Sequence, residues 1–316
     1  MEYLDMKVCM IGLGSIGTRH LNNIITICKE RNIAIQIDVL RSRVTELDRD
    51  IKEMIQNVYY RFEDLLSDYD VIFITNPTHL HFDTLVKVIE KTKHIFIEKP
   101  LFNNSSYKIN DIKLKMDQIC YIACPLRYTP VIQYLKNVIK TEFIYSVRAI
   151  SSSYLPSWRK NVDYRKVYSA KKSLGGGVTL DLIHEWDYLI YLFGNPQKVL
   201  NLNGKYSNLE IDSDDISIYI AQYKDKLVEV HLDYFGQDPV RALELYCKDY
   251  VIYADLRKQV IEYKGLDNKV IEFKTEDFYM NEMNYFFDII TKNVVNTNDL
   301  NTAYKTLQLI QQNNSI

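Results

Sequence analysis

The sequence predicts an α/β protein of two domains: a Rossmann-type, doubly wound parallel sheet, followed by an α+β domain with a mostly antiparallel sheet. Two observations predict this class. Residues 1–125 alternate short runs rich in valine and isoleucine with stretches whose apolar residues recur every three or four positions. From about Phe143, long strand-like stretches dominate, and several alternate polar and apolar side chains, as in a sheet with one wet face.

In the first domain, the elements follow one another as strands joined by crossover helices. Strands are predicted at Lys7–Ile11, Ile33–Leu40, Val58–Tyr60, Val71–Ile74, His94–Ile97 and Tyr121–Ala123. Helices are predicted between them, at Arg19–Lys29, Thr45–Gln56 and Phe82–Lys91.

In the second domain, strands are predicted at Ile144–Ser153, Val199–Leu202, Ile216–Gln222, Leu227–Tyr234, Ala242–Cys247, Val251–Asp255 and Lys269–Phe273. A helix from about Asp181 to Phe193 interrupts them and ends at Gly194. We assign residues 1–125 to the first domain and 126–283 to the second. The chain turns helical again after Glu276, and a C-terminal helical region, about 284–316, is expected to pack back on the first domain.

Composition excludes several classes of protein. The 39 Lys and Arg residues nearly balance the 41 Asp and Glu residues, so a net charge of −2 gives no electrostatic basis for binding nucleic acid. The apolar stretches are far shorter than the roughly 20 residues of a membrane helix, and the N-terminus lacks the pattern of a signal peptide. We therefore expect a cytoplasmic protein without membrane contact, with its five scattered cysteines reduced and buried.

A glycine pattern directly follows the first predicted strand. Gly12, Gly14 and Gly17 have the G-x-G-x-x-G spacing that binds a dinucleotide. The first glycine permits a tight turn, the second lets backbone approach a pyrophosphate, and the third lets the helix pack closely. Together with Ser15 and Ile16 at the start of the helix, these residues are predicted to bind the cofactor. The alternative is a glycine-rich turn that binds nothing.

The end of the second strand indicates which dinucleotide binds. Asp38 stands near the position where an acidic residue would hold the ribose of NAD, but Val39 and Leu40 continue the strand beyond it. At the tip, the sequence places Arg41, Ser42 and Arg43, and guanidinium groups bind phosphate in a bidentate manner. We therefore favour NADP over NAD, with a solvated, exposed turn as the alternative for the arginines.

Two further loops lie at the carboxyl edge of the predicted sheet, where ligands of open α/β folds bind. After the fourth strand come Asn76, Pro77, His79 and His81, and the fifth strand ends in Glu98 and Lys99. We expect cofactor contacts from both loops, at Asn76, Pro77, His81, Glu98 and Lys99. His79 and His81 have no third ligand at a suitable spacing, so no metal site is predicted.

A second group of candidate residues follows three consecutive glycines, Gly175 to Gly177. Asp181 and His184 are three residues apart and are predicted to share one face of a helix. A histidine that titrates near neutral pH can transfer a proton, and a neighbouring carboxylate can orient it. For the pair taken alone, we expect an ordinary capping aspartate beside a packed histidine rather than a catalytic pair.

Together these motifs resemble the glucose-fructose oxidoreductase, inositol dehydrogenase and rhizopine-catabolism (Gfo/Idh/MocA) family. The similar stretches are Gly12 to His20, Thr75 to His81, Glu98-Lys99-Pro100, Leu126-Arg127-Tyr128 and Gly175 to Asp187, in the family's order. The resemblance implies an NAD(P)-dependent oxidoreductase that acts on a secondary alcohol or ketone of a sugar, cyclitol or sugar derivative, with the nicotinamide between the domains. It also implies that the second domain's large, open sheet forms a homodimer or homotetramer.

The resemblance further implies that Lys99 contacts the reacting hydroxyl, Asp181 helps to hold it, and His184 acts as acid and base. Many members have three residues between that aspartate and histidine, whereas only Leu182 and Ile183 stand there in this sequence. The same fold also includes dinucleotide-binding sensors that do not turn over the cofactor and NAD-dependent glycosidases, which are the alternative functions.

A loop before the glycines mixes aromatic and cationic side chains. A sugar ring could stack on Trp158 or Tyr164, with an anionic group near Arg159 or Arg165. With Arg127 from the Leu-Arg-Tyr stretch, these residues complete the predicted substrate site. The loop is similar to those of family members associated with surface polysaccharides or nonulosonic acids, and a basic interdomain loop is the alternative.

Overall fold

The computed structural model describes residues 4–44, 46–265, 267 and 269–312. It divides the chain into two compact units, which are described separately. The first unit comprises Met1–Phe102, Ser106–Ala123 and Tyr279–Tyr304. The second comprises Asn103–Ser105, Cys124–Phe278 and Lys305–Ile316, so the last helix contributes residues to both.

The first unit is built on a parallel sheet of the order β3-β2-β1-β4-β5-β6. Its strands are β1 (Leu4–Ile11), β2 (Ile33–Leu40), β3 (Asn57–Tyr59), β4 (Tyr69–Ile74), β5 (Thr92–Ile97) and β6 (Ile119–Ile122). The order reverses between β1 and β4, and ligands of open α/β folds bind at such a point. The predicted Rossmann sheet is confirmed.

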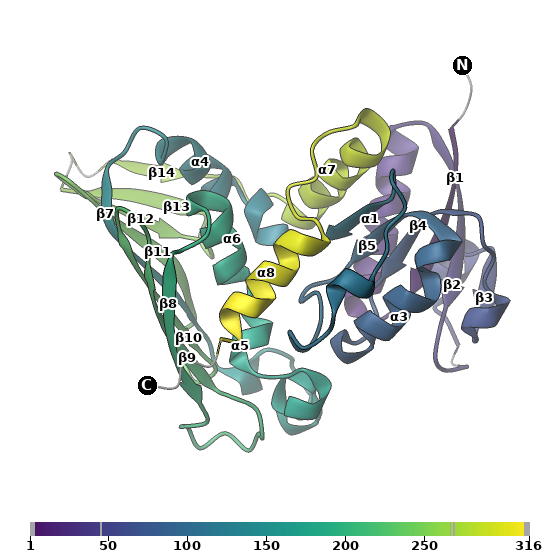
Figure 1. Ribbon diagram of the computed structural model, residues 1–316, viewed down its shortest axis with the longest axis horizontal. Helices are drawn as coiled ribbons and strands as arrows, with labels where there is room; N and C mark the ends of the chain where they lie inside the picture. Colours follow the sequence, from purple (N-terminus) through teal and green to yellow (C-terminus); the bar gives the residue numbers. More distant parts are fainter. Residues whose placement is uncertain (1–3, 45, 266, 268, 313–316) are drawn as a thin grey trace. The chain divides into compact units, whose positions relative to one another are not determined.

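Helices cover both faces of this sheet (Figure 1). Helix α1 (Ser15–Glu30) and α7 (Phe278–Lys292) share one face, because Phe96 of β5 packs against His20 of α1 and Phe286 of α7. Helix α3 (His81–Val88) follows β4. The core between the layers is aromatic, and its rings include Phe73, Phe96, Tyr121 and Phe286.

The helix predicted over Thr45–Gln56 is largely wrong. Only α2 (Arg49–Glu53) forms, and Thr45 lies outside the described residues. None of the residues of α2 is buried. A short helix without a buried apolar face gains no tertiary packing, which supplies most helix stability in proteins.

The second unit contains an eight-stranded sheet of the order β14-β13-β12-β11-β7-β10-β9-β8. Its strands are β7 (Ile144–Ser152), β8 (Lys198–Gly204), β9 (Ile216–Gln222), β10 (Leu227–Asp233), β11 (Val240–Cys247), β12 (Val251–Asp255), β13 (Val260–Lys264) and β14 (Val270–Glu272). All neighbours pair antiparallel except β7 with β10. The predicted mostly antiparallel sheet is confirmed, although β13 was not among the predicted strands.

Helices α4 (Pro130–Val138), α5 (Val178–Asp181) and α6 (His184–Phe193) lie along one face of this sheet (Figure 1). Helix α5 packs on β9 and β10, and α6 packs on β7. The sheet also carries exposed apolar side chains, among them Tyr145, Leu200, Leu202 and Ile220. The final helix, α8, spans Leu300–Ile310.

The helix predicted from about Asp181 to Phe193 is confirmed over α6, but its start is wrong, because the chain breaks at Leu182 and Ile183 and Asp181 belongs to the separate helix α5. Leu182 has φ −98° and ψ 29°, and the amide of Glu185 donates to the carbonyl of Leu182 instead of that of Asp181. The hydrogen bonds thus tighten to three-residue spacing at the break. Asp181 ends one helix and His184 begins the next.

Candidate active site

The glycine turn joins β1 to α1 at the point where the strand order reverses. Gly12 has φ +95°, a left-handed conformation that favours glycine, and its carbonyl accepts a hydrogen bond from the Thr75 hydroxyl at 2.7 Å. A methyl group on Gly17 would lie 2.3 Å from the carbonyl oxygen of Gly12. The absence of a side chain at Gly17 therefore lets α1 approach the turn.

Gly14 differs from the other two glycines of the pattern. Among the described residues, apart from Gly14 and its two chain neighbours, no atom lies within 4 Å of the position that a methyl group would occupy on Gly14. Both Gly14 and Ser15 are exposed. No side chain in the described part of the chain forms a capping hydrogen bond at the amino end of α1, and the first turn of this helix contains no acidic residue. Backbone N–H groups and the positive end of the helix dipole are thus presented at Ser15 and Ile16, an arrangement that fits the pyrophosphate of a dinucleotide.

The residues at the end of β2 separate into a buried acid and a cationic tip. Asp38 is 2% exposed, and its two carboxylate oxygens accept hydrogen bonds from Asn57 and Tyr69, each at 2.8 Å. Strand β2 continues past Asp38 to Leu40. Arg41 follows directly and is half-buried, whereas Ser42 and Arg43 are exposed.

His81 connects the loops that follow β4 and β5. Its Nε2 lies 2.9 Å from the carbonyl oxygen of Asn76, and its Nδ1 lies 3.1 Å from the carbonyl oxygens of Pro100 and Leu101. Burial lowers the pKa of His81 below its ordinary value, although these carbonyls favour the charged form. The imidazole is therefore engaged in holding the two loops together.

Asn76 and Pro77 form the rest of the loop after β4. The Asn76 side chain donates to the hydroxyl of Thr84 at 2.8 Å, and Pro77 is exposed. The loop after β5 contains a cis peptide bond between Lys99 and Pro100. Lys99 is half-buried at the carboxyl end of this strand.

Glu98 forms a buried pair that the sequence analysis did not identify. Its Oε1 lies 2.5 Å from Nε2 of His20, and its Oε2 accepts a hydrogen bond from the backbone amide of Lys99 at 3.1 Å. Burial would raise the pKa of Glu98, but the hydrogen bond and charge of His20, together with Lys99, outweigh it and lower the pKa. Glu98 thus anchors the backbone of Lys99 to α1.

In the second unit, the short helix α5 positions Asp181. Its first residues are held by Asp214, whose carboxylate accepts from the amide and the hydroxyl of Thr179 at 3.0 and 2.7 Å. Gly177 precedes the helix with φ +119°, and a methyl group there would lie 2.0 Å from Oδ1 of Asp214. The glycine therefore makes room for a cap that comes from a distant segment.

Two tyrosines lie near the carboxylate of Asp181, which is 4% exposed. Tyr234 donates a hydrogen bond to Oδ2 at 2.5 Å. Burial, together with the nearby charge of Asp181, raises the pKa of Tyr168 well above its ordinary value. Neither tyrosine was predicted as a site residue. Tyr234 directly follows β10 and Tyr168 lies in a loop, so no spacing in the sequence relates them to Asp181.

His184 is the first residue of α6 and is 9% exposed. Two ion pairs anchor this helix: Asp187 accepts a bidentate contact from Arg127 at 2.8 and 2.7 Å, and Glu185 lies 2.8 Å from Arg241 of β11. They fix the orientation in which His184 is presented. Arg127, predicted to bind substrate, is 2% exposed, and its guanidinium group is paired inside the second unit.

The loop with aromatic and cationic side chains lies next to the same tyrosines. Trp158 packs edge-on against Tyr234 with ring centroids 5.2 Å apart, and the charge of Arg159 acts on Tyr168. Trp158, Arg159 and Tyr164 line one small hollow. Arg165 differs, because Asp163 and Glu210 bind its guanidinium group at 2.8 and 3.1 Å.

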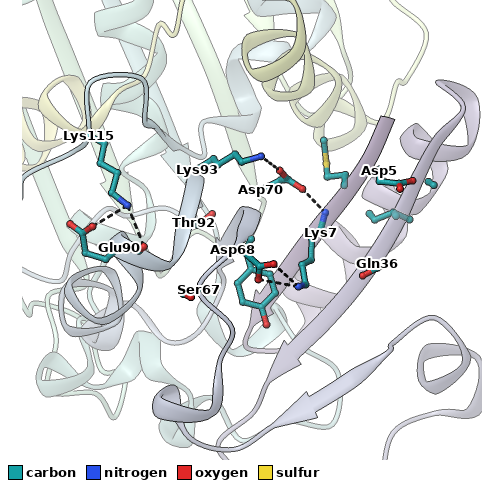
Figure 2. Close-up of a pocket in the computed structure, with 14 residues that line it drawn as sticks. Asp5, Lys7, Gln36, Ser67, Asp68, Asp70, Glu90, Thr92, Lys93 and Lys115 are labelled. Atoms are coloured by element: carbon teal, nitrogen blue, oxygen red, sulfur yellow. Dashed lines mark hydrogen bonds and ion pairs between the residues drawn. The ribbon is translucent and has the colours of Figure 1, made fainter. Parts of the chain in front are cut away.

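A pocket of the first unit lies at the end of the sheet opposite the glycine turn (Figure 2). It lies beside the amino-terminal ends of the strands, and its cations are paired with carboxylates: Lys7 with Asp68, Lys93 with Asp70 and Lys115 with Glu90. Each of these lysines is neutralised locally, so the pocket does not form a candidate site.

Comparison with known proteins identifies the family. Residues 6–113 match the model of an oxidoreductase family with an NAD-binding Rossmann fold, and residues 136–235 match the C-terminal alpha/beta domain of the same family. The two matches cover more than half of the chain. The chain belongs to the Gfo/Idh/MocA oxidoreductase family. The predicted family, its oxidoreductase class and its NAD-binding domain are therefore confirmed.

Relatives of this oxidoreductase include enzymes named for either cofactor. The chain is 26% identical to scyllo-inositol 2-dehydrogenase (NAD(+)) of Bacillus subtilis strain 168, over 84% of this chain and 73% of the relative. It is 23% identical to scyllo-inositol 2-dehydrogenase (NADP(+)) IolW of the same organism, over 65% of this chain and 57% of the relative. Among solved structures, levoglucosan dehydrogenase in complex with NADH and levoglucosan has the same fold, with TM-score 0.82 and 15% identity over 97% of this chain and 95% of that one.

Within the described part of this oxidoreductase, no cluster of three or more histidine, cysteine or acidic side chains could hold a metal ion. A search of the same residues finds no helix long and apolar enough to cross a membrane.

The glycine turn predicts opposite outcomes for two single-methyl substitutions. Gly17→Ala should lower the melting temperature, because its methyl group would collide with the Gly12 carbonyl, and should also weaken dinucleotide binding. Gly14→Ala should leave the melting temperature nearly unchanged, because its methyl group meets open space, and should still weaken binding by about tenfold or more if backbone approaches the pyrophosphate there. Thermal unfolding and titration of each variant with NADH and NADPH measure both effects. Unchanged cofactor affinity in Gly14→Ala would show that this turn does not bind the pyrophosphate.

Proposed function

We propose that this protein is an NADP-dependent dehydrogenase or reductase that acts on a secondary alcohol or ketone of a sugar, cyclitol or sugar derivative. The observation that carries the proposal is the open glycine turn at the end of β1, with an uncapped helix and space above Gly14. The relatives named inositol dehydrogenases and levoglucosan dehydrogenase support the substrate class.

A bound nicotinamide supplies the acceptor or donor of hydride. In the oxidation direction, His184 accepts the proton of the substrate hydroxyl, and the ammonium group of Lys99 stabilises the negative charge that develops on its oxygen. The carboxylate of Asp181 helps to hold the substrate by accepting a hydrogen bond from a neighbouring hydroxyl, because the single proton of the reacting hydroxyl goes to His184. Glu98 positions Lys99 through the backbone amide. In the reduction direction the proton returns from His184.

The function is tested by turnover of NADPH with keto-inositols and keto sugars, and of NADP with the corresponding alcohols. His184→Ala should lower kcat by about a hundred-fold or more and leave the dissociation constant of the cofactor nearly unchanged. A matched control is His94→Ala, at a half-buried histidine in β5 that should retain turnover. Cleavage of a glycoside without net cofactor consumption would indicate a hydrolase instead, and cofactor binding without any turnover would indicate a sensor.

We infer a preference for NADP from the end of β2. Asp38 is engaged with Asn57 and Tyr69 within the first unit and is followed by two more strand residues, which leaves it unsuited to hold a ribose at the tip. Arg41 directly follows the last strand residue, and Ser42 and Arg43 extend the polar tip. A guanidinium group there suits a 2′-phosphate.

Arg41→Asp should therefore weaken NADPH binding by about tenfold or more and weaken NADH binding much less. Fluorescence titration with both cofactors measures this difference. Arg49→Asp is a control with the same change in net charge, at an exposed arginine of α2. An equal loss of affinity for the two cofactors, or no loss of affinity, would contradict the assignment of Arg41 to the 2′-phosphate of NADP.

We further infer that the substrate carries an anionic group. Arg159 lines the hollow beside Trp158 and Tyr164, and no carboxylate of the described residues forms an ion pair with it. Arg165, the other candidate, is already bound by Asp163 and Glu210. The indole of Trp158 offers a face for a sugar ring, and Arg159 offers a charge for a carboxylate or phosphate.

Arg159→Gln should raise KM for an anionic sugar, such as a sugar acid or a nucleotide sugar, by about tenfold and change kcat little, because the lost contact is made equally in the ground and transition states. The matched variant Arg165→Gln should leave KM nearly unchanged. Steady-state kinetics with an anionic and a neutral sugar compare the two variants. An equal effect of both arginines, or preference of the wild type for the neutral sugar, would contradict the inference.

A further inference from the structure

His20 of α1 is a buried polar side chain to which the proposed chemistry gives no role. It is fully buried, and its Nε2 lies 2.5 Å from Oε1 of Glu98, which directly follows β5. Burial would raise the pKa of Glu98, but the hydrogen bond and charge of His20 and the charge of Lys99 outweigh it and lower the pKa. An ionised carboxylate only accepts hydrogen bonds, so Nε2 of His20 is the donor.

The second oxygen of Glu98 holds the backbone at Lys99. Its Oε2 accepts a hydrogen bond from the amide of Lys99 at 3.1 Å. The carboxylate therefore joins α1, through one oxygen, to the backbone of the lysine, through the other. It cannot turn without lengthening one of these two bonds, so a change at His20 should be felt at Lys99.

Aromatic packing fixes the direction of the His20 ring. The ring of Phe96 in β5 lies edge-on to the imidazole with centroids 5.0 Å apart, and the ring of Tyr279 in α7 does so at 6.2 Å. Nδ1 of His20 has no hydrogen-bond partner among the described residues. The imidazole thus directs its hydrogen bond to Glu98, and two packed rings prevent it from swinging away.

The same helix presents the predicted pyrophosphate site at its amino end. Ser15 begins α1, and His20 follows five residues later, between one and two turns along the helix. The close approach of Gly17 to the carbonyl of Gly12 lies between these two points and sets the helix against the turn. One helix therefore offers its end to the dinucleotide and, from its side, holds the backbone of Lys99.

We propose that His20 is a positioning residue: through Glu98 it sets the ammonium group of Lys99 relative to a dinucleotide bound at the amino end of the same helix. This inference rests on the proposed function, in which Lys99 stabilises the charge on the substrate oxygen. The alternative is that His20 only stabilises the fold. A positioning role predicts a loss of kcat with cofactor affinity preserved, because the amino end of α1 is held separately by the glycine contact.

Two amides of different length at position 20 test the proposal. In His20→Gln, the amide nitrogen can take the place of Nε2, so kcat should stay within about threefold of the wild type. His20→Asn is one methylene shorter and does not reach Glu98, so kcat should fall by about tenfold or more, with the dissociation constants of NADH and NADPH nearly unchanged. Asn23→Ala, which removes another buried polar side chain of α1, is the control and should keep kcat. Equal kcat values in the two His20 variants would overturn the proposal.

A double-mutant cycle separates the positioning of Lys99 from a general effect on the fold. Lys99→Met removes the ammonium group and keeps the backbone amide that Glu98 binds. In this background, His20→Asn should have little further effect on kcat, because the group that His20 positions is already absent. The same fold-loss of kcat in both backgrounds would contradict the proposal, because His20 would then act independently of the ammonium group.

Thermal unfolding tests the buried contact without a substrate. His20→Leu should melt several degrees below the wild type, because it leaves the buried carboxylate of Glu98 without this partner. Adding Glu98→Gln, which removes the charge and keeps an acceptor for the amide of Lys99, should recover part of that loss. Additive losses would show that His20 and Glu98 are not coupled and would overturn the proposal. Coupling in a protein that turns over no sugar or cyclitol would instead refute the proposed function.

Discussion

The close approach of α1 to the turn after β1 is the contact on which the first unit depends. Gly17 lies so near the carbonyl of Gly12 that even a methyl group would overlap it, and Thr75 of the neighbouring loop bonds that same carbonyl. The contact joins β1, α1 and the end of β4 at the point where the sheet order reverses. It therefore determines where the amino end of α1 is presented, and the loops that contain Asn76 and Lys99 are placed at the same edge.

In the second unit, polar and charged side chains are buried within the layer of helices that packs on the sheet. Three buried acids of α5 and α6 have partners from other elements: Asp187 has Arg127, Glu185 has Arg241 and Asp181 has Tyr234. Burial still raises the pKa of Glu185 despite the charge of Arg241, but all three pairs define how α5 and α6 are oriented. The break between the two helices follows, because Asp214 fixes the start of α5 while the ion pairs fix α6.

Much of the fold was predictable because hydrophobic periodicity reports which side chains are buried. The strands of the Rossmann sheet, the shift to an antiparallel sheet and the turn of Gly12 were all predicted from local patterns. The prediction of a helix at Thr45–Gln56 was largely wrong because it also relied on apolar spacing. That spacing suggested a buried face, which α2 does not have. A prediction from apolar spacing is accurate where the folded protein buries the predicted apolar face. It fails where no neighbouring helix or sheet covers that face.

The sequence by itself determined the class of fold through residue types and short spacings, and its resemblance to a known family also indicated the family and the candidates Lys99, Asp181 and His184. Only the tertiary structure decided which side chains hold those residues in position through hydrogen bonds. His20 is 78 positions from Glu98, and Tyr234 is 53 positions from Asp181, so no local signal connects them. It also distinguished Arg159 from Arg165, because the partners of a surface cation depend on which carboxylates the fold brings within reach.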